Sequence, residues 1–407
     1  MQLIGCLGLF LALAYNFISF ESGYAQFSFD RVKGDSGFEY EKPFQLYWTP
    51  RYNRIEGLFV NFGARFRPES APGVQFYGDA GWGFWNESGK EFRFNAGVHK
   101  DFFEFNRLSV GLDVFKELES EDNWIVGEVE NSLASLLFRE DFKDYYGIYG
   151  FRLYADHKFL GRHTLRAEVE RRTYDALRRN IDWSVFKGDF EENPASPGSR
   201  IIEGDELGFR LVAAFDWRDN PIFPLTGWYV QTIYEHTVDD FDTDGLFLTV
   251  KRFQQTFGTH RLLLRALLGT RRGSLAEQHT MDLGGIGSLR AFDDKEFSGN
   301  RMFLFSANYL FGGDILQRIP LQEVPLFGTL WTTLSLGVFL DAGQTHVAAV
   351  DGGLLTELGD VFDDLEADAG FSVLVLDGVL RLDVARRTSS APGKNDYRVT
   401  FRLLESF

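Results

Sequence analysis

The stretch Leu334-Ser335-Leu336-Gly337-Val338-Phe339-Leu340-Asp341-Ala342-Gly343 alternates between two kinds of side chain along its length. Its even-numbered residues form an unbroken apolar face, and Asp341 stands on the opposite, odd-numbered face. This pattern predicts a β-strand with one apolar and one polar face. In a soluble sandwich the apolar face would point inward and Asp341 would lie in water. In a membrane barrel the apolar face meets lipid, so Asp341 points into the lumen.

Similar segments recur at intervals of roughly 15 to 30 residues, as in transmembrane hairpins joined by loops. Clear examples are 92–99, 108–114, 209–216, 261–268 and 380–385. Charges opposite an apolar face are improbable in a soluble core but are expected in a wet lumen. The segments within 54–407 number about sixteen, each of about ten residues. The predicted fold class is therefore all-β, a transmembrane antiparallel β-barrel of about sixteen strands. The stretch 125–137 fits either a strand or a short amphipathic helix.

The connections between these segments alternate between short and long. Short turns are predicted at 377–378 and 220–227, and long loops at 174–205, 273–300 and 343–368. With both termini in the periplasm, the short turns fall on the periplasmic side and the long loops outside, as in outer-membrane barrels. The longer link at 312–328 is an exception, because it would be periplasmic.

The two ends of the chain carry export and assembly signals. Residues 1–25 are predicted to be a signal peptide, because an apolar run from Leu7 to Tyr15 precedes a small-residue cleavage site ending at Ala25. Residues 26–53 are then a short periplasmic segment, and 54–407 the barrel domain. The last segment alternates and ends on an aromatic residue, which resembles the signal by which the barrel assembly machinery takes up its substrates. Its outward residues are Tyr397, Phe401, Leu403 and Phe407.

Several motifs then occur in one order over 205–407. A turn with Asp216, Pro224 and Gly227 comes first, followed by two alternating strands. The run Gly284-Gly285-Ile286-Gly287-Ser288-Leu289-Arg290-Ala291-Phe292 follows, and Phe339, Asp341 and Gly343 come about fifty residues later. In order and spacing this part of the chain resembles the barrel of the outer-membrane insertase and transporter superfamily. That group includes BamA, TamA and the two-partner-secretion transporters, and its barrel is also called the bacterial surface antigen barrel.

The resemblance implies that the sixth outer loop folds into the lumen as a lid. Its residues Gly284, Gly285, Leu289, Arg290 and Phe292 match the lid motif, and the strand with Asp341 matches the partner motif. Ala291 departs from the glycine usual in the family. If the backbone there had a positive φ, alanine would cost about 1 kcal/mol or more and the loop tip would be arranged differently.

A second departure concerns POTRA modules, which precede the barrel in these relatives. The stretch 26–53 is too short for one, so a barrel-only member is expected.

The function implied by the resemblance is insertion or translocation of proteins or lipids at the bacterial outer membrane. Expected partners are outer-membrane lipids, lipopolysaccharide and the assembly machinery, with the client polypeptide unknown. A net charge of −17 argues against nucleic acid as a partner. The alternative is a porin-like passive or selective channel. No enzymatic activity is expected, because no histidine has a spacing that predicts a triad. No cofactor and no metal site are predicted, and the acidic clusters at 238–244 and 358–368 are interpreted as solvated loops.

Overall fold

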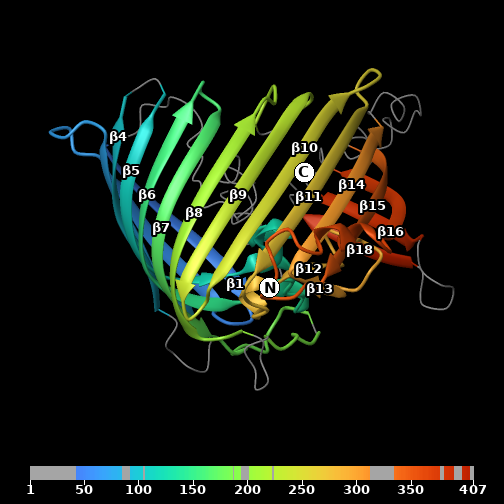
Figure 1. Ribbon diagram of the computed structural model, residues 1–407, viewed down its shortest axis with the longest axis horizontal. Coiled ribbons are helices and arrows are strands. Elements are labelled where there is room, and N and C mark those ends of the chain that lie inside the picture. The colour runs from blue at the N-terminus through green and yellow to red at the C-terminus, as the bar shows by residue number, and fades with distance from the viewer. Residues whose placement is uncertain are drawn as a thin grey trace, which may run out of the picture.

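The computed structural model describes residues 43–84, 92–103, 106–186, 188–193, 201–221, 224–311, 334–375, 380–388 and 397–403 (Figure 1). Its main feature is one antiparallel sheet of 16 strands in chain order, which curves into a barrel. The strands are β1 (Phe44–Asn53), β2 (Gly57–Phe66), β3 (Val74–Phe84), β4 (Phe92–Phe102), β5 (Leu108–Glu119), β6 (Tyr146–Phe159), β7 (His163–Ala176), β8 (Gly204–Asp216), β9 (Gly227–Asp239), β10 (Thr243–Gln255), β11 (Arg261–Arg272), β14 (Arg301–Phe311), β15 (Ser335–His346), β16 (Glu366–Val375), β17 (Leu380–Arg387) and β18 (Tyr397–Leu403). The predicted fold class is thus confirmed.

The two faces of the strands have the predicted polarity. On β15, Val338 and Leu340 are 46% and 44% exposed, whereas Phe339 and Asp341 are 5% and 0% exposed. An apolar surface this continuous on the outside of a barrel is the surface that lipid covers. The interior holds most of the buried charges and a large apolar cluster.

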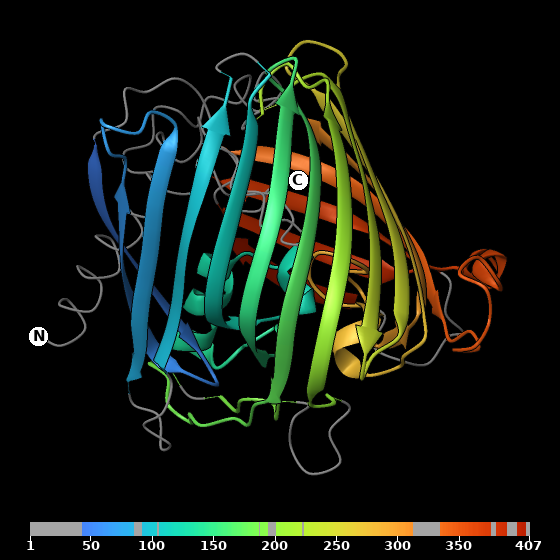
Figure 2. The ribbon, with the colours of Figure 1, turned by 60° about the vertical axis from the view of Figure 1, so that its left-hand side comes forward.

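The remaining elements lie in the connections at one end of the barrel; in Figure 2 most of them are drawn low in the barrel, and the last, coloured red, at its right-hand edge. The third loop at this end, 120–145, contains η1 (Glu121–Trp124) and α2 (Glu128–Phe138). The sixth, 273–300, contains η2 (Glu277–His279) and a small sheet of β12 (Met281–Leu283) and β13 (Phe297–Gly299). The seventh contains η4 (Leu358–Phe362). None of the helices in the described residues is long and apolar enough to cross a membrane.

The structure decides one assignment that the sequence left open and corrects another. The stretch 125–137 forms most of α2, so the helical reading holds there. The sheet begins at Phe44 rather than at Arg54, and β1 lies in the stretch assigned to a periplasmic segment. Pro50 has no backbone N–H, so β1 lacks one hydrogen-bond donor at this position. An edge strand tolerates this because it pairs with another strand on one side only.

At the other end of the barrel, the predicted turn of Asp216, Pro224 and Gly227 joins β8 to β9. The Asp216 carboxylate accepts hydrogen bonds from the backbone N and Nε of Arg218, both at 2.9 Å. Gly227 has φ +124°, and a Cβ there would lie 2.4 Å from the Trp217 carbonyl oxygen, so only glycine fits. The predicted features at 312–328, 377–378 and Phe407 lie outside the described residues.

Candidate functional site

The sixth loop, 273–300, folds back into the barrel and is called the lid below (Figure 1). It enters through η2 and β12, turns, and leaves through β13. The turn needs glycine, since Gly284, Gly285 and Gly287 have φ of +118°, +82° and +77°. A Cβ on Gly285 would lie 1.7 Å from an Asp294 oxygen. The two glycines of the predicted motif therefore give the lid its tight turn.

Arg290 stands at the centre of the lid and its side chain is buried. Its Nε lies 3.1 Å from Asp341 Oδ2 on β15, and its Nη2 donates to Asn308 Oδ1 on β14 at 2.9 Å. Its Nη1 lies 3.5 Å from Asp383 Oδ2 on β17. The guanidinium also stacks over the Phe339 ring, 3.9 Å from its centroid. One side chain thus joins the lid to three separate strands, rather than forming a two-pronged pair with Asp341 alone.

The residue after Arg290 is held by the barrel wall as well. The Ala291 backbone N donates to Asp368 Oδ2 at 2.9 Å, and its carbonyl accepts from Arg387 Nε at 3.1 Å. Ala291 is not among the described residues with positive φ. The superfamily that the sequence resembles usually has glycine at this position. The backbone of Ala291 is free of left-handed strain, so alanine is accommodated and the lid stays in the lumen.

Phe292 completes the motif and lies between two arginines. The Arg387 guanidinium covers its ring at 4.2 Å from the centroid, and Arg398 donates to its carbonyl oxygen. Phe297 of β13 packs against the same ring, with centroids 5.4 Å apart. Arg387 also bonds Glu296, at 3.1 and 2.5 Å, and Arg398 bonds Asp294 at 2.6 Å. Strands β17 and β18 thereby hold the lid through contacts additional to the Arg290 pairs.

Apolar packing fixes the lid along its whole length. Leu283, Ile286, Leu289 and Phe292 are each 3% exposed or less and belong to one cluster inside the barrel. The wall contributes residues of β8 to β11, β14 and β15, and the third loop contributes residues 124–126. Gly343 on β15 makes room for this contact, since a Cβ there would lie 3.2 Å from Leu283 Cδ1. The predicted lid residues are therefore core residues of the barrel interior.

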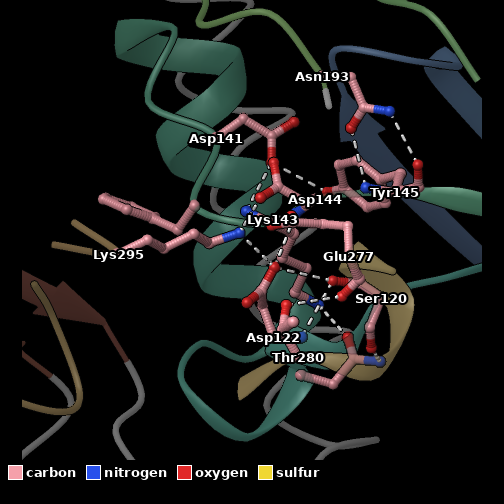
Figure 3. Close-up of polar contacts among 12 residues, drawn as sticks. Ser120, Asp122, Asp141, Lys143, Asp144, Tyr145, Asn193, Glu277, Thr280 and Lys295 are labelled. Atoms are coloured by element: carbon pink, nitrogen blue, oxygen red, sulfur yellow. Dashed lines mark hydrogen bonds and ion pairs between the residues drawn. The ribbon is translucent and has the colours of Figure 1, made fainter. Parts of the chain in front are cut away.

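The lid also meets the third loop through a cluster of acidic groups around one lysine (Figure 3). Lys295 Nζ lies 2.7 Å from Asp122 Oδ2 and also pairs with Asp144. Asp144, Glu277 and Asp282 lie close enough together to hold a metal ion. Lys295 already supplies a positive charge beside them. Burial raises the pKa of Asp282 to about 6, even though Lys295 opposes the shift.

Beside the lid, η1, strands β5 to β9 and β11 line a polar chamber with a cavity volume of about 70 Å³. Its charges are paired, with Arg152 Nε 2.7 Å from Glu170 and Arg271 Nη2 2.7 Å from Glu235. Glu121 of the third loop faces this chamber, and burial raises its pKa to about 7 while Arg271 opposes the shift. The interior therefore contains a region lined by charged side chains as well as the packed lid.

Five residues that hold the lid were not predicted from the sequence: Asn308, Asp368, Asp383, Arg387 and Arg398. Asp368 was interpreted as part of a solvated acidic loop, and the structure corrects this. It lies on β16, fully buried and directly across from Asp341 in the strand register. The alternation of β16 was a usable signal, because it places Asp368 on the lumen face with Ser372.

The comparisons with known proteins agree with this architecture. No protein-family model matches the chain, and no curated protein matches it in sequence. The structure is similar to that of BamA from Haemophilus ducreyi lacking POTRA domains 1-3, with a TM-score of 0.55 and 12% sequence identity. The match covers 89% of this chain and 69% of that one. The chain has the fold of a BamA barrel.

Weaker matches include CdiB from Acinetobacter baumannii, with a TM-score of 0.42 and 10% identity over 88% of this chain and 59% of that one. CdiB from Escherichia coli has a TM-score of 0.43 and 14% identity, over 89% and 62%. At identities this low, the likeness to BamA concerns the fold, and activity is a separate question.

Proposed function

We propose that this protein is an integral outer-membrane barrel that takes part in inserting or translocating proteins or lipids at that membrane. The observation that carries the proposal is the docked lid, held through Arg290 to three strands of a BamA-like barrel. A lid packed into the barrel interior obstructs free diffusion. An insertase instead acts by perturbing the bilayer around its wall, which needs no open lumen.

The same proposal includes location and partners. The exposed apolar residues of the wall would contact outer-membrane lipids and lipopolysaccharide. Residues 1–25 would direct export, and the last strand would present the barrel to the assembly machinery. Tyr397 and Phe401 on that strand point outward and are 63% and 55% exposed, as such a signal requires. The action is proposed to be mechanical, with no enzymatic step and no cofactor.

One observation favours a second candidate, a selective channel. The polar chamber lined by paired Arg and Glu side chains is a feature that ion-conducting lumens share. For conduction the lid would have to leave its seat.

The test is the folding of a second, urea-denatured outer-membrane barrel into liposomes that contain or lack this protein. We expect faster client folding with the wild type and altered rates with Arg290→Ala. Arg178→Ala is the matched control, since Arg178 is an exposed arginine of the 177–203 loop. Client folding that is no faster than in empty liposomes would refute the insertase role. Steady ion conductance in the same liposomes would then favour the channel.

A further inference from the structure

The first and last strands of the sheet are its two edges. Within the part of the chain that the structure describes, β1 pairs with β2 and β18 pairs with β17, and neither has a second strand partner. An edge strand presents a row of backbone groups that need partners. In a membrane, water cannot satisfy them. What lies in the gap between β1 and β18, called the seam below, therefore decides how the barrel is closed.

Helix α2 of the third loop contacts the β18 side of the seam. Glu130 on this helix is buried, and its Oε1 accepts from the Leu403 backbone N at 2.8 Å. Its other oxygen lies 2.9 Å from Arg402 Nη2. The same Arg402 nitrogen donates to the Ile125 carbonyl just before the helix, at 2.9 Å. A helix side chain thus takes the place of a neighbouring strand for a backbone donor of β18.

The same helix contacts the β1 side two residues further along. Ser132 Oγ accepts from the Tyr52 backbone N at 3.1 Å. Leu136, one turn later, packs against the buried cluster formed by Tyr52, Ile181 and Phe190. One backbone N–H of each edge strand, that of Leu403 and that of Tyr52, is therefore satisfied by a side chain of the same helix. At this level of the seam, α2 stands between the strands.

Neighbouring loops hold α2 in this position. Val185 N and Phe186 N of the 177–203 loop donate to the carbonyls of Leu136 and Leu137, both at 2.9 Å. On the lid side, a Cβ on Gly287 would lie 2.5 Å from the Ile125 carbonyl oxygen, so the lid turn packs directly against the segment leading into α2. The helix is thus linked both to the loop outside the barrel and to the lid within.

We propose that α2 is a latch that closes the seam between β1 and β18 through side-chain contacts in place of strand pairing. Because Glu130 and Ser132 make these contacts, the helix can leave without unzipping a ladder of backbone hydrogen bonds. Release of the helix would then open the barrel wall at this one place. This inference goes beyond the proposed function and does not depend on it, since its test needs no client.

The test measures the distance between spin labels on the outward residues Leu46 of β1 and Val399 of β18, which are 74% and 64% exposed. Each is replaced by cysteine, Cys6 is replaced by serine, and the full chain is studied in liposomes. The wild type should give one narrow distance distribution. The double variant Glu130→Ala with Ser132→Ala should raise a longer-distance population about tenfold or more, since a charge-assisted hydrogen bond is worth that factor in an equilibrium.

The matched control is Glu128→Ala with Ser135→Ala, which makes the same chemical change on the same helix. Glu128 pairs with Lys143 and has a longer-range electrostatic interaction with Arg51 of β1, and Ser135 Oγ donates to the Glu140 carbonyl. Neither residue therefore makes a hydrogen bond to the backbone of an edge strand. The proposal is overturned if the Glu130 variant keeps the wild-type distance, or if the control opens the seam equally.

If the double variant does not fold, the same distance measurement on the single variant Glu130→Gln tests the proposal. It keeps an acceptor for Leu403 N and loses the charge opposite Arg402. A longer-distance population in this variant supports the latch, and an unchanged distribution overturns it.

Discussion

Removing the Arg290 side chain should release the lid from the lumen. Arg290 is 3% exposed and Asp341 is fully buried, so the change leaves a buried carboxylate without its cation. Breaking a buried pair from one side costs about 3–5 kcal/mol. We expect a net loss of about 3 kcal/mol of lid docking, which is a factor of about a hundred in the docking equilibrium.

The assay is native-state hydrogen exchange of the backbone amides of β12 and β13 in Arg290→Ala. Two paired strands of three residues are not stable without the packing of the docked lid, so exchange of these amides reports its release. The double variant Arg290→Ala with Asp341→Asn should lose less, about 1–2 kcal/mol, because no charge is then left unpaired. Exchange within about twofold of the wild type in Arg290→Ala would show that Arg290 does not hold the lid.

Two further predictions concern the contact between the lid and the third loop. The pKa of Asp282 is raised to about 6, so the folded state holds its proton more tightly than the unfolded chain. Protonated Asp282 therefore stabilises the docked lid fully below about pH 4. This stabilisation, of up to about 3 kcal/mol, is lost as the pH rises to about 6. Asp282→Asn should remove this pH dependence from the exchange of β12, and an unchanged profile would contradict the assignment. Gly287→Ala should loosen the lid by about 1 kcal/mol or more, because Gly287 has φ +77° and a Cβ would meet the Ile125 carbonyl. Gly359→Ala, where a Cβ meets nothing within 4 Å, should leave the thermal midpoint unchanged, and equal shifts in both variants would argue against the close contact.

Periodicity was enough to predict the barrel and the inward position of Asp341. Two-residue alternation records which face of a strand meets lipid, and this information is local in sequence. The position of Arg290 beside Asp341 was implied by the order of the motifs. The sharing of Arg290 among Asp341, Asn308 and Asp383 was not, because it depends on the register of β14 to β17 and on the path of the lid. The path of the lid through the barrel cannot be predicted from a local sequence pattern.

The role of α2 was also beyond a local pattern. The stretch 125–137 has the residues of an amphipathic helix, but its polar residues Glu130 and Ser132 look like ordinary solvated positions in sequence. Their partners, Leu403 and Tyr52, lie at the two ends of the sheet. Asp368 was misplaced for a similar reason, since it follows an acidic loop and only the register with β15 shows that it faces the lumen.

The most direct test of the account is to record client folding and ion conductance in one set of liposomes that contain the wild-type protein. If the protein is an insertase with its lid docked in the lumen, a denatured outer-membrane barrel should fold faster than in empty liposomes while ion conductance stays low. Steady conductance with no acceleration of folding would contradict the account.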